Sequence, residues 1–454
     1  MADANQLRDP DYKPPLAEAV PLGIQHVLAM FAGNITVPLI VALAAGPQYI
    51  TVLVQIALLA AGVATLIQTV GIGPIGARLP IVQGTSFAYI GVLVGALKGG
   101  ATLAAVFGAS LVGGLFQVVL GYFIPQIRKW IPALVSGVVV MTIGFTLLPV
   151  GIKYAAGCGA YPAEFCKAKG FGDPSHWLLA LFVILITLLI RRYGKGIWST
   201  ASIFIGLVIG YIVAIPFGMV DGKKVEAIGN AKWFGLPETH FGLDFSSEAA
   251  LSLIGLMCIM AFITTIETVG DISGVTMGGA GREPTDKELR GGIMADGLGS
   301  AVVALFGGLP NTSYSQNVGL VSFTKVMSRH VVTIGAFFLI LCGLIPKLAA
   351  VIAALPEPVL GGAAIVMFGM IVAAGMKLVG HSGYNTRNML IVAISLGLGM
   401  GLWQVDQLAK LVKFSPLPVD SLPSWSVPLL VSGIVVSGIA AAIMNAVMPH
   451  EEMD

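Results

Sequence analysis

The sequence predicts an all-α protein that crosses a membrane many times. Of its 454 residues, 56% are hydrophobic and only 11% are charged, whereas a soluble protein has about 25% charged residues. Apolar runs close to the ~20 residues that cross a bilayer recur along the whole chain, for example at 177–190 and 332–346. The net charge of +2 gives no reason to expect a nucleic-acid partner. We therefore expect the chain to lie in a lipid bilayer.

Hydropathy, together with the spacing of Gly and Pro, predicts fourteen transmembrane spans. They are expected near 18–44, 51–72, 81–96, 101–124, 131–151, 176–191, 199–217, 248–272, 290–308, 311–328, 330–349, 356–375, 387–404 and 425–448. With both termini in the cytoplasm, every arginine falls on the cytoplasmic side, as the excess of positive charge in cytoplasmic loops requires. The loop with Cys158 and Cys166 would then lie outside, where the two could form a disulfide.

Four weak matches in the same order suggest that the chain consists of two related halves. The matched segments are 60–65 with 295–300, 84–88 with 311–315, 121–125 with 342–346, and Pro132 and Gly137 with Pro356 and Gly361. Two halves of seven spans each would be inverted relative to each other, as in many secondary transporters. In this alignment the two least hydrophobic spans, the third and the tenth, are equivalent.

Those two spans carry polar clusters where a hydrophobic helix would be expected. They contain "VQGTSFAYIG" (82–91) and "NTSYSQNVGL" (311–320). Irregular backbone at membrane depth is tolerated only where it is buried in protein or lines an aqueous cavity. We therefore expect each segment to begin extended and to continue as a half-helix, with free backbone N–H groups near a substrate site.

Four ionisable residues inside predicted spans are candidates for function: His26, Glu267, Asp271 and Asp296. A charge at the centre of a bilayer costs at least roughly 2.5 kcal/mol. Glu267 and Asp271 lie four residues apart on one helix face, and carboxyl groups so close to each other favour the retention of a proton. The structural alternatives are that Asp271 is solvated at a helix end, that Asp296 accepts backbone N–H groups, and that His26 only packs between helices.

Gln316, Asn317 and Phe87 lie at the two breaks and suit a flat ligand with a polar edge. An amide offers donors and an acceptor, which match the N–H and C=O groups of a planar heterocycle. Glu267 could accept a hydrogen bond from a ring N–H. Phe87 could pack its ring against the ligand, or it could be an ordinary core aromatic.

The segment "QNVGLVSFTK" (316–325) resembles the signature of the nucleobase–ascorbate transporter family. In that signature Gln, Glu or Pro precedes Asn-x-Gly, followed by four residues and Thr. The segments "SRHV" (328–331), "GIQHVLAMFAG" (23–33), "QGTSFAYIG" (83–91) and "ETVGD" (267–271) also look like the family and occur in its order. The resemblance covers residues 15–448.

The resemblance implies a core domain that binds substrate and a gate domain against which the core moves in an elevator-like way. The implied divisions are a cytoplasmic tail at 1–15, core segments at 16–125 and 248–350, gate segments at 126–217 and 351–448, an extracytoplasmic loop at 218–247, and a second cytoplasmic tail at 449–454. Members of the family lie in the cell membrane and are typically homodimers joined through their gate domains.

The family's functional residues map onto this chain by motif position. The implied set comprises the substrate-binding residues Glu267, Gln316, Phe87, Ser315 and Asn317; the supporting or proton-coupling residues Asp271, Asp296 and His26; and Thr324 and Lys325, which would affect selectivity or access. Gln316 resembles the purine branch, whereas Glu and Pro at that position are typical of the uracil and ascorbate branches. The expected function is therefore the proton-coupled import of xanthine and/or uric acid.

Three other functions stay open as alternatives. A uracil or ascorbate symporter would belong to the same family, and sulfate and bicarbonate carriers share the seven-plus-seven architecture. An enzyme is not expected, because the sequence has no metal-spacing cluster, nucleophile motif or phosphate loop. No cofactor is expected beyond the proton as coupling ion.

Overall fold

The structure is a computed structural model that describes residues 6, 8–159, 166, 170–238, 241–412 and 430–449. The tail predicted at 449–454 and the start of the last predicted span lie largely outside the described residues. Up to residue 247 the elements are α2 (Leu16–Ala45), η1 (Pro47–Tyr49), α3 (Ile50–Val70), β1 (Gln83–Thr85), η2 (Phe87–Tyr89), α4 (Ile90–Lys98), α5 (Leu103–Ile127), η3 (Arg128–Trp130), α6 (Ala133–Ala155), α8 (Pro174–Tyr193), α9 (Ile197–Thr200), α10 (Ser202–Ala214) and α11 (Gly222–Asn230).

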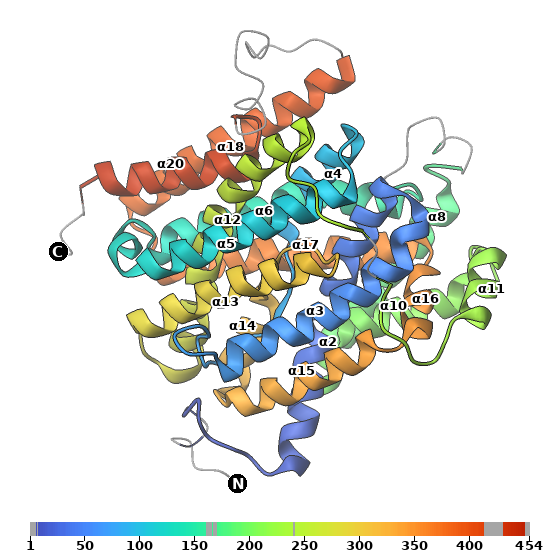
Figure 1. Cartoon of the computed structure of the whole chain (residues 1–454), viewed down its shortest axis with the longest axis horizontal. Helices are drawn as coiled ribbons and strands as arrows, with labels where there is room; N and C mark the ends of the chain where they lie inside the picture. The colour runs from blue at the N-terminus through green and yellow to red at the C-terminus, as the bar shows by residue number, and fades with distance from the viewer. Residues whose placement is uncertain are drawn as a thin grey trace.

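The second part of the chain has a similar order of elements. These are α12 (Glu248–Val275), the short π-helix η4 (Thr276–Ala280), α13 (Asp286–Leu305), β2 (Asn311–Ser313), α14 (Ser315–Thr324), α15 (Arg329–Gly343), α16 (Pro346–Ala353), α17 (Glu357–His381), α18 (Thr386–Val412) and α20 (Gly433–Val447). In both parts a short strand separates long helices. Figure 1 shows helices of the two parts side by side, with α13 next to α5 and α15 next to α3.

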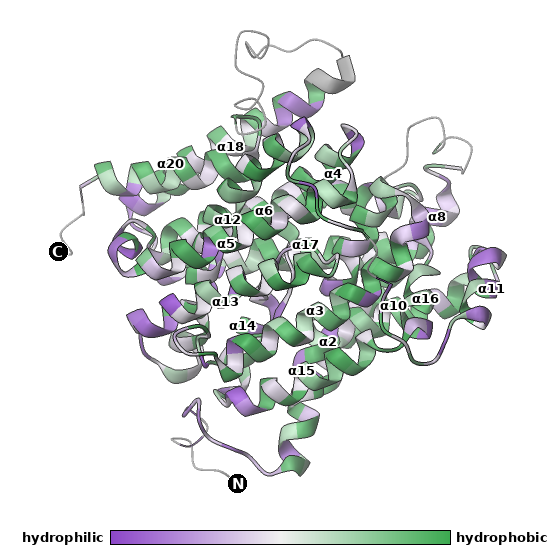
Figure 2. Cartoon of the chain, viewed as in Figure 1, coloured by the Kyte–Doolittle hydropathy of each residue, from purple (hydrophilic) through white to green (hydrophobic). Residues whose placement is uncertain are grey.

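The helices have the length and composition of a membrane protein. In the described part of the chain, eight helices are long and apolar enough to cross a membrane, and a bent pair, α15 and α16, makes a ninth if it counts as one span. Figure 2 shows hydrophobic residues along the helices and hydrophilic ones mainly near helix ends and in α11. The structure therefore agrees with an all-α polytopic protein, while the number of fourteen spans stays a prediction.

Two helices that carry candidate residues begin at clear capping signals. At the start of α12, Ser247 accepts a hydrogen bond from the Ala250 N–H, 3.1 Å away. Just before it, hydrogen bonds from the Ser247 side chain and from the backbone N–H groups of Ser246 and Ser247 lower the pKa of the exposed Asp244 to about 2. The α13 helix begins with a capping box, in which Thr285 and Glu288 bond each other's backbone N–H.

The two predicted breaks meet in the middle of the protein. The β1 and β2 strands pair antiparallel, with Gln83 opposite Ser313 and Thr85 opposite Asn311. Both strands are fully buried. The α4 helix follows β1 after one turn of 3₁₀-helix, and α14 follows β2. The expectation of extended segments that continue as short helices is therefore confirmed for both breaks.

A hydroxyl group from a neighbouring helix fixes one residue of each strand. Thr65 on α3 accepts a hydrogen bond from the Gln83 N–H at 2.9 Å and donates to the Gln83 C=O at 3.4 Å. Ser300 on α13 likewise accepts a hydrogen bond from the Asn311 N–H at 2.9 Å and donates to the Asn311 C=O at 3.1 Å. These bonds satisfy backbone groups that a two-stranded ladder leaves unpaired, which is required of polar groups at this depth.

Helix packing follows the same duplicated pattern. The α6 helix packs along α17, α5 packs along α13 and α12, and α15 packs along α3 and α2. Small residues allow these helices to approach closely, as is usual in membrane proteins. At Gly297 on α13, an added Cβ would lie 2.6 Å from the Gly114 O and 2.6 Å from the Val118 N of α5. At Gly62 on α3, it would lie 2.6 Å from the Ala336 O of α15.

The eleventh predicted span differs from its prediction, which was one continuous helix at 330–349. The chain breaks between α15 and α16, whose axes differ by 79°. Pro346 is the first residue of α16, and because proline has no N–H and restricts the residue before it, it favours a new helix over the continuation of an old one. Cys158 and Cys166, between α6 and α8, form a disulfide with their Cα atoms 5.4 Å apart.

We expect Gly297→Ala to destabilise the protein by about 1–3 kcal/mol, because the new methyl group overlaps the backbone of α5. The measurement is the thermal unfolding of the purified protein in detergent. Gly255→Ala on α12 is the matched control, since a Cβ there meets nothing within 4 Å. Equal stability of the two variants would contradict the close contact of α5 and α13.

Candidate functional site

The α12 helix presents a row of polar residues toward the crossing of the two strands. Thr264, Glu267, Thr268 and Asp271 recur at intervals of three and four residues, so they share one face, and all four are buried. Thr264 lies within 3.4 Å of both the Tyr89 hydroxyl and the Gln117 amide nitrogen. The polar face of α12 therefore extends along the whole crossing.

Asp296 is fully buried and ties four elements together. Its Oδ1 accepts hydrogen bonds from the side-chain amides of Gln83 on β1 and, at 3.5 Å, of Gln68 on α3. Its Oδ2 accepts from the hydroxyls of Thr268 on α12 and, at 3.5 Å, of Thr312 on β2. All four donors are neutral, and in the described residues no ion pair involves Asp296.

Asp271 is held by two serine hydroxyls, one at the end of β2 and one at the start of α14. Ser313 donates to its Oδ2 and Ser315 to its Oδ1, each at 2.6 Å. Only 2% of Asp271 is exposed. The alternative of a solvated residue at a helix end is therefore wrong, because Asp271 connects α12 to the segment that contains Gln316.

Glu267 and Gln316 have polar atoms without partners. The Oε2 atom of Glu267 is buried and accepts no hydrogen bond from the described residues. The Gln316 amide is half-buried and makes no hydrogen bond within the described part of the chain. Buried polar groups are nearly always satisfied in folded proteins, so the two side chains are available to a ligand or to water.

His26 and Asn317 contact each other between α2 and α14. The Asn317 Nδ2 donates to the His26 C=O at 2.9 Å and lies 3.1 Å from the His26 Nδ1. The pair thereby fixes α14 against α2.

Phe87 is 7% exposed and packs on aromatic rings. Its ring centroid lies 5.7 Å from that of Phe368 of α17 and 6.0 Å from that of Tyr314.

Thr324 and Lys325 lie at the far end of α14. The Thr324 hydroxyl donates to the Leu320 C=O of its own helix at 3.0 Å. Lys325 adopts a left-handed backbone conformation with φ of 59° and donates from Nζ to the Gly278 C=O of η4 at 2.5 Å. Both residues lie outside the polar cluster of Glu267, Asp271 and Asp296, and Lys325 joins the ends of η4 and α14.

Asn34 is a site residue that the sequence did not single out. Its Oδ1 accepts from the Thr85 N–H at 2.8 Å, and its Nδ2 donates to the Ala57 C=O at 3.2 Å. The Tyr314 hydroxyl donates to the Thr85 C=O at 2.9 Å. Asn34 follows His26 by two helical turns on α2, and this spacing was the signal that could have identified it.

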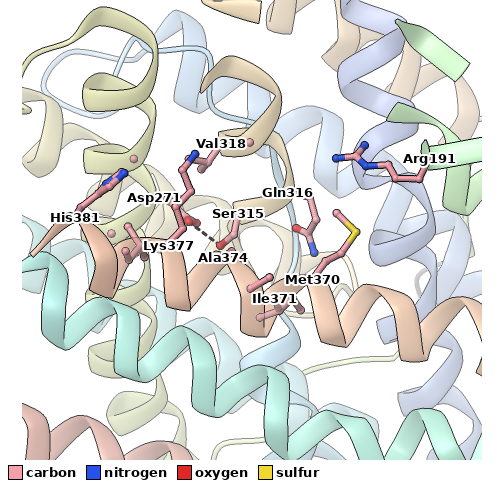
Figure 3. A pocket seen from close by; sticks show the side chains of 15 residues that line it. Arg191, Asp271, Ser315, Gln316, Val318, Met370, Ile371, Ala374, Lys377 and His381 are labelled. Atoms are coloured by element: carbon pink, nitrogen blue, oxygen red, sulfur yellow. Dashed lines mark hydrogen bonds between the residues drawn. The ribbon is translucent and has the colours of Figure 1, made fainter. Parts of the chain in front are cut away.

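A cavity of about 290 Å³ opens beside the crossing. Among the expected site residues it is lined by Asp271, Ser315 and Gln316. Its opposite wall comes from α17 and from Arg191 at the end of α8. Figure 3 shows Asp271 bonded to Ser315 on one side and Gln316 facing Met370 and Ile371. The cavity therefore lies between α12 and α14 on one side and the α8–α17 pair on the other.

The architecture is that of known membrane transporters. The transmembrane domain of the cyanobacterial bicarbonate transporter BicA aligns with a TM-score of 0.56 and 15% identity, over 95% of this chain and 97% of that one. Murine Slc26a9, an anion transporter, aligns with a TM-score of 0.61 and 12% identity, over 96% and 68% of the two chains. At such low identity the similarity shows the fold alone, which is that of a multi-pass membrane protein.

Sequence comparison identifies the family. Residues 17–408 match the model of the Permease family, Xan_ur_permease. Relatives include the xanthine permease XanP of Escherichia coli, 35% identical over 97% of this chain and 94% of that protein, and the uric acid transporter UacT of the same organism, 33% identical over 93% and 84%. The chain therefore belongs to the nucleobase–ascorbate transporter family. The relatives named above are transporters and not enzymes.

Proposed function

We propose that the protein imports oxidised purine bases, xanthine and/or uric acid, by proton symport. The observation that carries the proposal is the unpartnered amide of Gln316 on the wall of the cavity, together with the buried carboxylate of Glu267, one helical turn before Asp271 of the same wall, whose Oε2 atom also lacks a partner among the described residues. The purine substrates named for XanP and UacT agree with it. As a family member, the protein would lie in the cell membrane with both termini in the cytoplasm.

The free groups suit the edge of an oxidised purine. Such a base presents alternating N–H and C=O groups, and the Gln316 amide can accept from one and donate to the next. Glu267 would accept a hydrogen bond from a further ring N–H. Ser315 and Phe87 would contribute backbone groups at the two breaks, while Asn317 and His26 hold α14 in place.

Proton coupling would use the buried carboxyl groups. Glu267, Asp271 and Asp296 are buried on α12 and the neighbouring α13, and none of them forms an ion pair among the described residues. A site with several uncompensated carboxylates favours protonation of at least one of them. Binding of a proton with the substrate would reduce the charge that has to move through the membrane, because a charge at that depth is costly.

We infer further that the chain consists of two inverted seven-span repeats. In such a repeat, the packing of α5 on α13 is equivalent to the packing of α15 on α3. The close helix contact at Gly297 is likewise equivalent to the one at Gly62. The hydrogen bonds between Thr65 and Gln83 are equivalent to those between Ser300 and Asn311. With the strand register observed, a two-fold axis between the strands makes Gln83 equivalent to Asn311. The sequence match pairs Asn311 with Gly84, so the two alignments differ by one residue.

Alternating access would be an elevator-like motion of a core against a gate. The strand crossing and its neighbours α2–α5 and α12–α15 would form the moving core, and α6, α8, α10, α17, α18 and α20 would form the gate. The cavity between Gln316 and α17 lies at this boundary. Homodimerisation through the gate domains is proposed on family resemblance.

The test is uptake of radiolabelled xanthine into proteoliposomes with an inward proton gradient. We expect gradient-driven uptake that unlabelled urate blocks and that uracil and ascorbate do not. Uptake independent of the gradient would refute proton symport. Competition by uracil or ascorbate would indicate that the protein is a uracil or ascorbate symporter of the same family. Bicarbonate or sulfate flux without xanthine uptake, by folded protein, would indicate an anion carrier.

A further inference from the structure

The wall of the cavity opposite α12 and α14 carries three basic residues. Arg191 lies in the last turn of α8, and Lys377 and His381 lie at the end of α17. All three side chains are exposed to the cavity mouth, and Asp271 supplies the one carboxyl group among the described residues that line it. In the view of Figure 3, Gln316 lies between Arg191 and Lys377.

These basic groups are not neutralised by acidic partners. In the described part of the chain, neither Arg191 nor Lys377 forms an ion pair. The Arg191 guanidinium donates to the Ser199 C=O at 3.1 Å, which leaves other N–H groups of the guanidinium free. Each oxygen of Asp271 accepts a hydrogen bond from a serine hydroxyl, and Asp271 forms no ion pair among the described residues. The mouth therefore carries unpaired positive charge.

The preference for positive charge on cytoplasmic ends of spans explains only part of this arrangement. It accounts for cations at these helix ends, where the predicted topology has the cytoplasm. It does not account for their placement on the wall that faces Gln316. Arg192, on the same turn as Arg191, is exposed but does not line the cavity.

We propose that Arg191, Lys377 and His381 bind the negative charge of an anionic purine at the cavity mouth, so that the site favours urate over uncharged xanthine. The inference rests on the proposed function and specifies which of the two purines the site prefers. Uric acid carries one more carbonyl group than xanthine and is the stronger acid. At slightly acid pH urate is a monoanion, whereas xanthine is largely uncharged. A cleft lined by one sign of charge concentrates ligands of the opposite sign.

The test measures binding of radiolabelled urate and xanthine to the purified full-length protein in lipid nanodiscs, at slightly acid pH and low salt. The variant Arg191→Gln/Lys377→Met should weaken urate binding roughly tenfold, with little change in xanthine binding. Arg191→Lys/Lys377→Arg should retain urate binding. The matched control Arg192→Gln/Lys195→Met removes two cations near the same helix end that do not line the cavity, and should behave as wild type.

Salt gives a second test that needs no variant. Added salt should weaken urate binding by the wild-type protein and leave xanthine binding nearly unchanged, because it screens charge. Equal weakening of both ligands in the first variant, or equal salt dependence, would overturn the inference alone. Wild-type protein that binds neither purine would overturn the proposed function and this inference with it.

Discussion

Replacement of Glu267 by glutamine is expected to weaken purine binding strongly and to abolish proton-coupled uptake. The Glu267 side chain is 7% exposed, and its Oε2 has no partner among the described residues. Glutamine keeps the shape but replaces an acceptor oxygen with an N–H donor, which would face a ring N–H of the base. Loss of a hydrogen bond to a charged group costs roughly 2–3 kcal/mol, or about 100-fold in affinity.

The measurement combines xanthine binding to purified protein with uptake by proteoliposomes, and thermal unfolding shows whether the variant is folded. Glu248→Gln is the matched control, because Glu248 is an exposed residue in the first turn of the same helix. It should bind and transport like the wild type. Proton-coupled xanthine uptake by folded Glu267→Gln protein would refute the central role that we give to this carboxylate.

The broken backbone was predictable because its cause is local. Polar residues within an apolar chain at 83–85 and 311–313 are expensive in a bilayer, and the sequence places them there twice. Their pairing was not predictable, since it joins residues more than two hundred positions apart. The bend before Pro346 had a local signal, but the hydrophobic run on both sides of it favoured one helix.

The candidate site was predictable in its residue types and less so in its geometry. Intramembrane carboxylates stand out in any apolar sequence, and motif position identified Gln316 and Ser315. The hydrogen bonds of Asn34 with Thr85, and the basic wall formed by Arg191 and Lys377, depend on how each helix is rotated about its axis. At a helix end a lysine in a cavity and a lysine at the membrane surface have the same sequence signature.

Asp296→Ala is expected to destabilise the crossing of β1 and β2 and to eliminate transport. The buried carboxylate accepts hydrogen bonds from Gln83 and Thr268 and from two more distant donors. Each buried donor left without an acceptor costs about 1–3 kcal/mol. We expect a clear fall in thermal unfolding temperature in detergent. Asp286→Asn removes an exposed carboxylate at the start of the same helix, paired with Arg128 at 2.7 Å, and should cost less than about 1 kcal/mol.

A second substitution separates lost hydrogen bonds from general damage to the core. Gln83→Leu removes one of the donors that Asp296 satisfies. If the destabilisation of Asp296→Ala arises from unsatisfied donors, the double variant should be less destabilised than the sum of the two single variants, because one buried donor is no longer left unpaired. Additive losses would mean that Asp296 and Gln83 act independently. Wild-type stability of Asp296→Ala would mean that the carboxylate is not what joins the two strands to α3 and α12.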